Sequence, residues 1–134
     1  NNFLDKINKF NLGSCVNYLG VVTGNEKNQL LSNADLFVLP TNYINEGQPV
    51  SIIEAMAFET AVIATRYRSI VDMIDEGIEG LFVEYGNSQS IADEIRKIII
   101  NPKLLKSMQS AAKKRFLNEF TKQLHLRQME KLFF

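Results

Sequence analysis

The sequence has a single cysteine, Cys15, a single histidine, His125, and no tryptophan. A lone thiol excludes an internal disulfide and a cysteine-based zinc site, and it is typical of proteins in a reducing compartment. No apolar run exceeds four residues, whereas a membrane-spanning helix needs about 20. Neither a targeting peptide nor an initiator methionine is visible at Asn1. We therefore expect a cytoplasmic protein without disulfides, present here as a fragment of a longer chain.

An excess of charge of one sign is also absent, because 15 basic and 15 acidic residues give a net charge of zero. Nothing overall therefore predicts nucleic acid as a partner. The two parts of the chain differ, however, since residues 1–95 carry a net charge of −8 and residues 96–134 a net charge of +8. We expect the basic part to form a solvated helix face, and peripheral contact with the inner face of an anionic membrane is the alternative.

The chain does have a composition that is 46% hydrophobic, which is enough for a core in a chain of domain size. Short apolar segments of strand length alternate with segments of helical periodicity. Strands are predicted at 16–19, 36–39, 62–64 and 81–83, and helices at 3–13, 26–33, 50–58, 70–74, 90–100, 102–120 and around 124–132. Because parallel strands need crossover connections, this order predicts an α/β fold: a Rossmann-like, doubly wound parallel sheet with helices on both faces.

The loop 40–49 joins the strand 36–39 to the helix 50–58, and it is the first place to look for a site, since ligands bind beyond the carboxyl ends of parallel strands. The start of a helix offers free N–H groups and the positive end of the helix dipole, which suit a phosphate. Glu46 lies on the loop, and Glu54 follows in the second turn of the helix. Their carboxylates can accept hydrogen bonds from sugar hydroxyls. A phosphate site flanked by two carboxylates predicts a nucleotide sugar as the ligand.

Residues 46–57 read Glu-Gly-Gln-Pro-Val-Ser-Ile-Ile-Glu-Ala-Met-Ala and resemble the Glu-x7-Glu signature of the family-4 retaining glycosyltransferases of GT-B fold. On both sides of this motif, further segments resemble segments of that family and occur in the same order. They are 16–20 and 33–40 before the motif, and 62–65, 75–83 and 120–121 after it. The resemblance therefore covers nearly the whole chain. It implies the C-terminal, donor-binding domain of a two-domain enzyme, truncated at its N-terminal side.

The resemblance also implies roles for individual residues. Glu46 would contact the donor sugar as the catalytic residue, and Glu54 would bind the ribose hydroxyls. The diphosphate would lie on the backbone of residues 47–50, and the nucleotide base near the turn from Gly20 to Val22. The implied donor-binding residues are thus Gly20, Val22, Glu46, Gly47, Gln48, Pro49, Val50 and Glu54. No metal ion and no cofactor are implied, because the nucleotide sugar is a substrate.

The sequence departs from the family at several positions. Glu59 and Arg68 stand where the family usually has glycine. Two strands that carry basic residues for the diphosphate are absent, and they would lie between the strands 16–19 and 36–39. We expect these two strands either to pair directly or to pair across a dimer. The final helix, at about 121–134, would pack toward the absent N-terminal domain, and the fragment alone would be inactive.

The resemblance implies transfer of a hexose from a nucleotide diphosphate sugar to a glycan or lipid-linked acceptor, which the absent domain would bind. A non-catalytic nucleotide-binding or interaction module is the alternative. Outside the motif, we expect Cys15 in the core and His125 either on the surface or in helix packing. Arg66 and Arg68 are expected to face solvent, with contact to a phosphate as the alternative.

Overall fold

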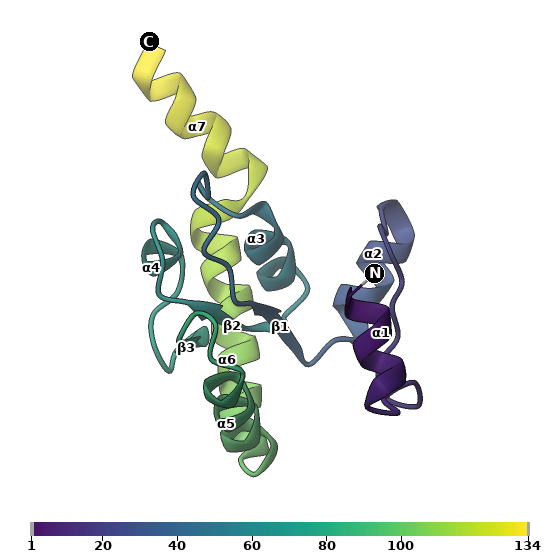
Figure 1. Ribbon diagram of the computed structural model, residues 1–134. Coiled ribbons are helices and arrows are strands. Elements are labelled where there is room, and N and C mark those ends of the chain that lie inside the picture. Colours follow the sequence, from purple (N-terminus) through teal and green to yellow (C-terminus); the bar gives the residue numbers. More distant parts are fainter. Residues whose placement is uncertain (1, 134) are drawn as a thin grey trace.

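The computed structural model describes residues 2–133 and contains a three-stranded parallel sheet of order β1-β2-β3 (Figure 1). The strands are β1 (Leu36–Leu39), β2 (Ala61–Thr65) and β3 (Gly80–Val83). The helices are α1 (Asn2–Lys9), α2 (Gly24–Asn33), α3 (Val50–Ala57), α4 (Ile70–Met73), α5 (Ser88–Ile99), α6 (Pro102–Arg115), the π-helical turn η1 (Phe116–Phe120) and α7 (Lys122–Phe133). Because all three strands are parallel, their carboxyl ends lie at one edge of the sheet.

The core is built around β2, all five residues of which are buried. Successive side chains of a strand point to opposite faces of the sheet. Val62 and Ala64 accordingly pack in one cluster with residues of α3 and α4. Ala61 and Ile63 pack in a second cluster with residues of α5 and α6. The predicted α/β fold, with a parallel sheet and helices on both faces, is confirmed.

The predicted strand at 16–19 is wrong. These residues belong to the irregular connection between α1 and α2, where Tyr18 is 55% exposed and Leu19 is 53% exposed. A strand needs a hydrogen-bonded neighbour for its backbone groups, and within residues 2–133 no strand lies beside this segment. Cys15, which we expected in the core, is exposed in the same connection.

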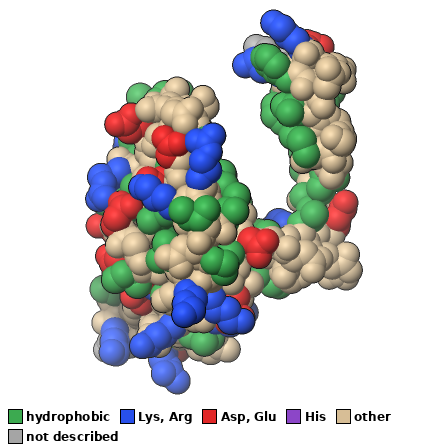
Figure 2. Space-filling view, turned by 90° about the horizontal axis from the view of Figure 1, so that it is seen from below, with side chains coloured by type: hydrophobic (Ala, Val, Ile, Leu, Met, Phe, Trp, Pro, Cys, Tyr) green, Lys and Arg blue, Asp and Glu red, His purple; other side chains and the backbone are tan. Residues whose placement is uncertain are grey.

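Together, α1, α2 and their connection form an arm at the side of the sheet (Figure 1), which is attached to the body through α2, where Lys27 pairs with Glu54 at 2.6 Å. Figure 2 shows the arm at right angles to this view, with an open gap between part of the arm and the body of the molecule. Direct pairing of residues 16–19 with β1 is therefore a wrong expectation. In the described part of the chain β1 is paired along one edge only, with β2. Pairing across a dimer stays a prediction.

The final helix, α7, projects from the body of the molecule (Figure 1). Its side chains Leu132 and Phe133 are 77% and 70% exposed. Phe134, the last residue of the predicted final helix, lies outside the described residues. Packing of this helix toward another domain stays a prediction. Among residues 2–133, no helix combines the length and apolar character that crossing a bilayer requires.

The backbone is left-handed at the two positions where the family usually has glycine. The φ angle is 61° at Glu59 and 45° at Arg68. Glu59 follows the end of α3, where its N–H donates to the Met56 carbonyl at 3.1 Å and the Thr60 N–H donates to the Ala55 carbonyl at 3.0 Å. This pair of bonds is a Schellman motif, which favours glycine at the position of Glu59. The chain at the end of α3 therefore adopts the conformation that favours glycine, although Glu59 has a side chain that is unfavourable there.

We expect Glu59→Gly to stabilise the fold by about 1 kcal/mol, because glycine adopts the left-handed conformation without a Cβ penalty. Urea denaturation followed by circular dichroism measures the change. Lys106→Gly is the control, since Lys106 is exposed in the right-handed interior of α6, and glycine there should destabilise by about 1 kcal/mol. Equal destabilisation by both substitutions would contradict the strain at Glu59.

Candidate functional site

The loop between β1 and α3 lies beyond the carboxyl end of the sheet, as the sequence predicts for a binding site. Pro49 is buried and caps α3, so that the helix begins at Val50, one residue after the proline. Val50 is 63% exposed. The N–H groups of the first turn of a helix have no intrahelical acceptor. The exposed start of α3 is therefore open to an anionic group.

Glu46 is half-buried and is oriented by a residue at the end of β1. The Thr41 hydroxyl donates to Glu46 Oε2 at 3.1 Å, and the Thr41 carbonyl accepts from the Thr65 hydroxyl at the end of β2. The Gly47 carbonyl accepts from the Ser69 hydroxyl. The loop that carries Glu46 is thus attached to the chain that follows β2, and within the described residues Glu46 Oε1 has no protein donor.

Glu54 lines a cavity of about 250 Å³ between α2 and α3, together with Val22, Lys27, Leu30, Leu31, Phe37 and Ser51. Its Oε1 accepts from Lys27 Nζ at 2.6 Å, and the two side chains are 35% and 36% exposed. Val22 and Glu54, predicted separately for the base and the ribose, therefore meet in one cavity. Gly20 is not among the residues that line it; it has a φ of 67°, a conformation that favours glycine.

Gln48 belongs to a different cavity. It lines a space of about 690 Å³ with Ile53, Asp72, Asn118, Glu119, Phe120, Lys122, His125 and Gln128. His125 is exposed there, as expected. The predicted site residues are therefore divided between two cavities. Val22 and Glu54 line one of them, and Gln48 lines the other, beside α7. Glu46 lines neither cavity and lies on the loop between β1 and α3.

Lys27, the ion-pair partner of Glu54, is a residue of the site that the sequence does not predict. Lys27 is one of only five basic residues before Arg96. Because basic residues are rare in this acidic part of the chain, Lys27 stands out in the sequence as a candidate partner for a carboxylate. The spatial pairing was not predictable, because residues 27 and 54 meet only after the chain has crossed from α2 through β1 to α3.

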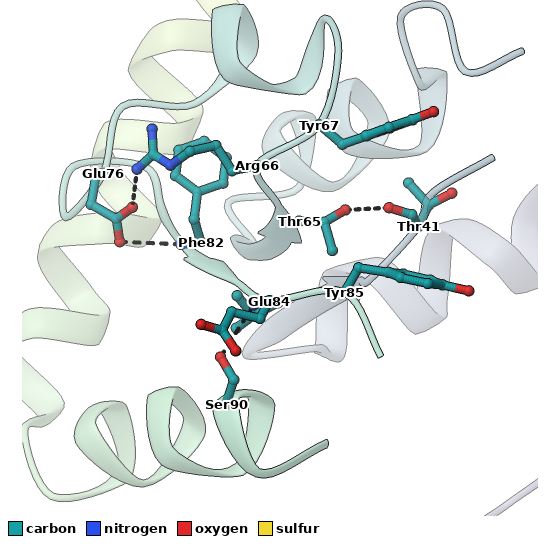
Figure 3. Close-up of a pocket in the computed structure, with 10 residues that line it drawn as sticks. Thr41, Thr65, Arg66, Tyr67, Glu76, Phe82, Glu84, Tyr85 and Ser90 are labelled. Carbon is teal, nitrogen blue, oxygen red and sulfur yellow. Dashed lines mark hydrogen bonds and ion pairs between the residues drawn. The ribbon is translucent and has the colours of Figure 1, made fainter. Parts of the chain in front are cut away.

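A further pocket, of about 540 Å³, lies at the carboxyl ends of the three strands (Figure 3). Its lining comprises Thr41, Thr65, Arg66, Tyr67, Glu76, Phe82, Val83, Glu84, Tyr85 and Ser90. Arg66 pairs with Glu76 at 2.7 Å and lies over the Phe82 ring at 4.2 Å. With its side chain 60% exposed, Arg66 agrees with the expected solvent-facing position, and its charge is balanced by Glu76.

Within residues 2–133, no group of three histidine, cysteine, aspartate or glutamate side chains is placed to hold a metal ion. The polar groups of the site are two separate carboxylates, hydroxyls and the exposed start of a helix. These groups suit a polyol and a phosphate.

Comparison with known proteins identifies the family. The sequence pattern of the glycosyl transferases group 1 matches residues 1–115. CapM of Staphylococcus aureus, a capsular polysaccharide biosynthesis glycosyltransferase, is 32% identical over 102 residues, which cover 76% of this chain and 26% of CapM. The chain belongs to the group 1 glycosyl transferases.

Solved structures agree on the fold. Sucrose-phosphate synthase from Thermosynechococcus elongatus matches 98% of this chain with a TM-score of 0.87 and 24% identity, over 32% of its own chain. HepE of Anabaena, solved in complex with UDP-glucose, matches 98% of this chain with a TM-score of 0.84 and 22% identity, over 35% of its own chain. The fold is that of the GT-B glycosyltransferases, and this chain spans about a third of the length of these two proteins.

Proposed function

We propose that this chain is the donor-binding part of a retaining glycosyltransferase, which transfers a hexose from a nucleotide diphosphate sugar to a glycan or lipid-linked acceptor. The observation that carries the proposal is the cavity in which Val22 and Glu54 meet, next to the exposed start of α3. CapM, by its name, acts in capsular polysaccharide biosynthesis, and HepE was solved with UDP-glucose. Both support polysaccharide biosynthesis with a nucleotide-sugar donor.

In this proposal Glu54 accepts hydrogen bonds from the ribose hydroxyls, and the base lies on the apolar side of the cavity near Val22. Lys27 orients the Glu54 carboxylate and adds a positive charge at the edge of the site. The backbone of residues 47–50 holds the diphosphate, whose departure the N–H groups of α3 stabilise. Glu46 contacts the sugar. We assign no metal ion and no cofactor a role.

We further propose a cytoplasmic location with peripheral contact to the inner face of a membrane. Lys103, Lys106 and Lys114 are exposed on α6 and could meet anionic lipid. Lys113, which belongs to the same basic part of the chain, donates instead to the Ala57 carbonyl at 2.5 Å. The basic surface is therefore smaller than the sequence suggests.

Titration of the 134-residue chain with UDP, GDP and ADP, by calorimetry or by NMR for weak binding, tests the proposed donor site. For the nucleotide that binds, we expect Glu54→Ala to weaken affinity about ten- to a hundredfold, because a hydrogen bond to a charged group contributes roughly 1.5 to 3 kcal/mol.

Glu26→Ala is the matched control, since it removes the same charge from the residue next to Lys27. It should leave the affinity unchanged. Lys27→Ala separates the two effects of the ion pair: if Glu54 binds ribose itself, Lys27→Ala weakens binding less than Glu54→Ala does. Equal affinity of the wild type and Glu54→Ala, or no binding of any of the three nucleotides, would remove the donor site from this cavity.

A further inference from the structure

The pocket at the carboxyl ends of the strands has two tyrosines that the proposed donor site does not use. Figure 3 shows Tyr67 and Tyr85 extending along opposite sides of the pocket, with Thr65 and Thr41 between them. Tyr67 follows β2 and Tyr85 follows β3, so the loops after two neighbouring strands each contribute one ring. We call this space the tyrosine pocket, defined by Thr41, Arg66, Tyr67, Glu84 and Tyr85.

The Tyr85 ring is open to solvent, whereas Tyr67 is half-buried. Tyr85 is 60% exposed, and within the described residues its hydroxyl has no protein partner. The Tyr67 hydroxyl accepts from Arg68 Nε at 3.1 Å, which leaves its own proton free to donate. An aromatic ring that is exposed beside polar groups suits a ligand with one apolar face and a polar rim.

The charges in the pocket argue against a phosphate or a nucleotide. Arg66 is balanced by Glu76 at 2.7 Å, and this leaves Glu84 as the charge without a cationic partner in the pocket. Glu84 Oε2 accepts from Asn87 Nδ2 at 2.7 Å, so its other oxygen can accept from a ligand hydroxyl. Arg68, whose Nε donates to the Tyr67 hydroxyl, adds a second positive charge beside the pocket, so that its two arginines and two glutamates carry no net charge. A pocket without net charge suits a neutral ligand that donates hydrogen bonds.

An apolar ligand fits no better, because the Arg66 guanidinium covers the Phe82 ring at 4.2 Å. The Phe82 ring is therefore not free to stack on an apolar ligand. A pyranose has an apolar face of C–H groups and a rim of hydroxyls, and it matches rings at the sides with carboxylate and hydroxyl groups around them. The volume of about 540 Å³ leaves room for more than one sugar unit.

The tyrosine pocket is also joined to Glu46. Thr41 lines the pocket and donates to Glu46 Oε2 at 3.1 Å. If Glu46 contacts the donor sugar, as the proposed function holds, a sugar in the tyrosine pocket lies next to the unit that is transferred. We propose that the tyrosine pocket binds a neutral oligosaccharide, one part of the acceptor glycan, by stacking a sugar ring on Tyr85, while the absent domain binds the rest of the acceptor; the assignment as acceptor rests on the proposed function.

The test is an NMR titration of the 134-residue chain with maltotriose, lactose and N,N′-diacetylchitobiose. The chain has four tyrosines and no tryptophan, so the tyrosine ring signals report the pocket directly. We expect at least one of these sugars to shift the ring signals of Tyr67 and Tyr85. Tyr85→Ala should raise its dissociation constant about tenfold or more, whereas Tyr85→Phe, which keeps the ring, should change it by less than about threefold.

Tyr18→Ala is the control, because Tyr18 is 55% exposed on the arm and contacts Phe3 rather than the pocket. It should bind the sugar as the wild type does. Melting curves of all variants by circular dichroism establish that each one is folded. No binding of any of the three sugars, or equal binding by Tyr85→Ala, would overturn the proposal.

Titration of the same variants with the nucleoside diphosphate separates this proposal from the donor site. Tyr85→Ala should retain nucleotide affinity, and Glu54→Ala should retain sugar affinity. Loss of sugar binding in Glu54→Ala would contradict a separate tyrosine pocket. Sugar binding that depends on Tyr85, in a chain that binds no nucleotide, would support the pocket and overturn the proposed donor function.

Discussion

Replacing Glu46 by alanine is expected to lower the rate of sugar transfer about a hundred- to a thousandfold in the complete two-domain enzyme. The carboxylate would accept hydrogen bonds from the donor sugar, and these bonds strengthen as the sugar gains positive charge in the transition state. Affinity for the free nucleoside diphosphate should stay unchanged, because in the proposed function Glu46 contacts the sugar alone. Initial rates with the donor that binds, together with calorimetry of the nucleoside diphosphate, measure both quantities.

Two variants serve as controls for Glu46→Ala. Asn45→Ala changes the preceding exposed residue and should leave the rate of transfer unchanged. Thr41→Val removes the hydroxyl that donates to Glu46 Oε2, so it should lower the rate by less than Glu46→Ala does. A Glu46→Ala enzyme with the full rate of transfer would exclude Glu46 from the site, and a wild type without transfer would favour the non-catalytic nucleotide-binding module.

Arg115→Met is expected to destabilise the fold by roughly 3 kcal/mol, because it leaves a buried carboxylate without its partner. Glu79 is 5% exposed, and its Oε2 lies 3.5 Å from Arg115 Nη1 and accepts from the Asp75 N–H at 2.8 Å. The same guanidinium pairs with Asp75 at 2.7 Å and donates to the Asp72 carbonyl at 2.9 Å. Urea denaturation at neutral pH measures the loss.

The effect of Arg115→Met should not vary between pH 7 and pH 9. Burial lowers the pKa of Arg115, but the charges of Glu119, Glu79 and Asp75 raise it, and the net direction is upward. A raised pKa means that the contribution is fully present below the ordinary pKa of arginine and is lost only as the pH rises above it.

Arg96→Met is the control for Arg115→Met. Arg96 pairs with Asp93 at 2.7 Å, but the two side chains are 64% and 52% exposed. Solvent screens such a pair, so its loss should change the free energy of unfolding by about 0.5 kcal/mol or less. Equal losses for Arg115→Met and Arg96→Met would contradict the structural role of the buried pair.

Three of the four predicted strands were found because each signal is local. The apolar run 36–39 ends at Pro40, and the structure places β1 at Leu36–Leu39. The runs 62–64 and 81–83 became β2 and β3, each longer by one or two residues. The segment 16–19 has a similar apolar pattern, but its backbone has no strand beside it in residues 2–133. A strand depends on its neighbour, and a single segment of sequence does not reveal whether the neighbour is there.

By itself the sequence determined the fold class and the place of the loop 40–49 between a strand and a helix, because periodicity and helix entry depend on residues close together in the chain. The roles of Glu46 and Glu54, which rest on the spacing of the motif, stay predictions. Only the tertiary structure decided that Lys27 pairs with Glu54, and that Tyr67 and Tyr85 border one pocket. These contacts join residues that lie on different helices or on loops after different strands. The packing of helices on a parallel sheet brings them together, and no local pattern encodes which side chains then meet.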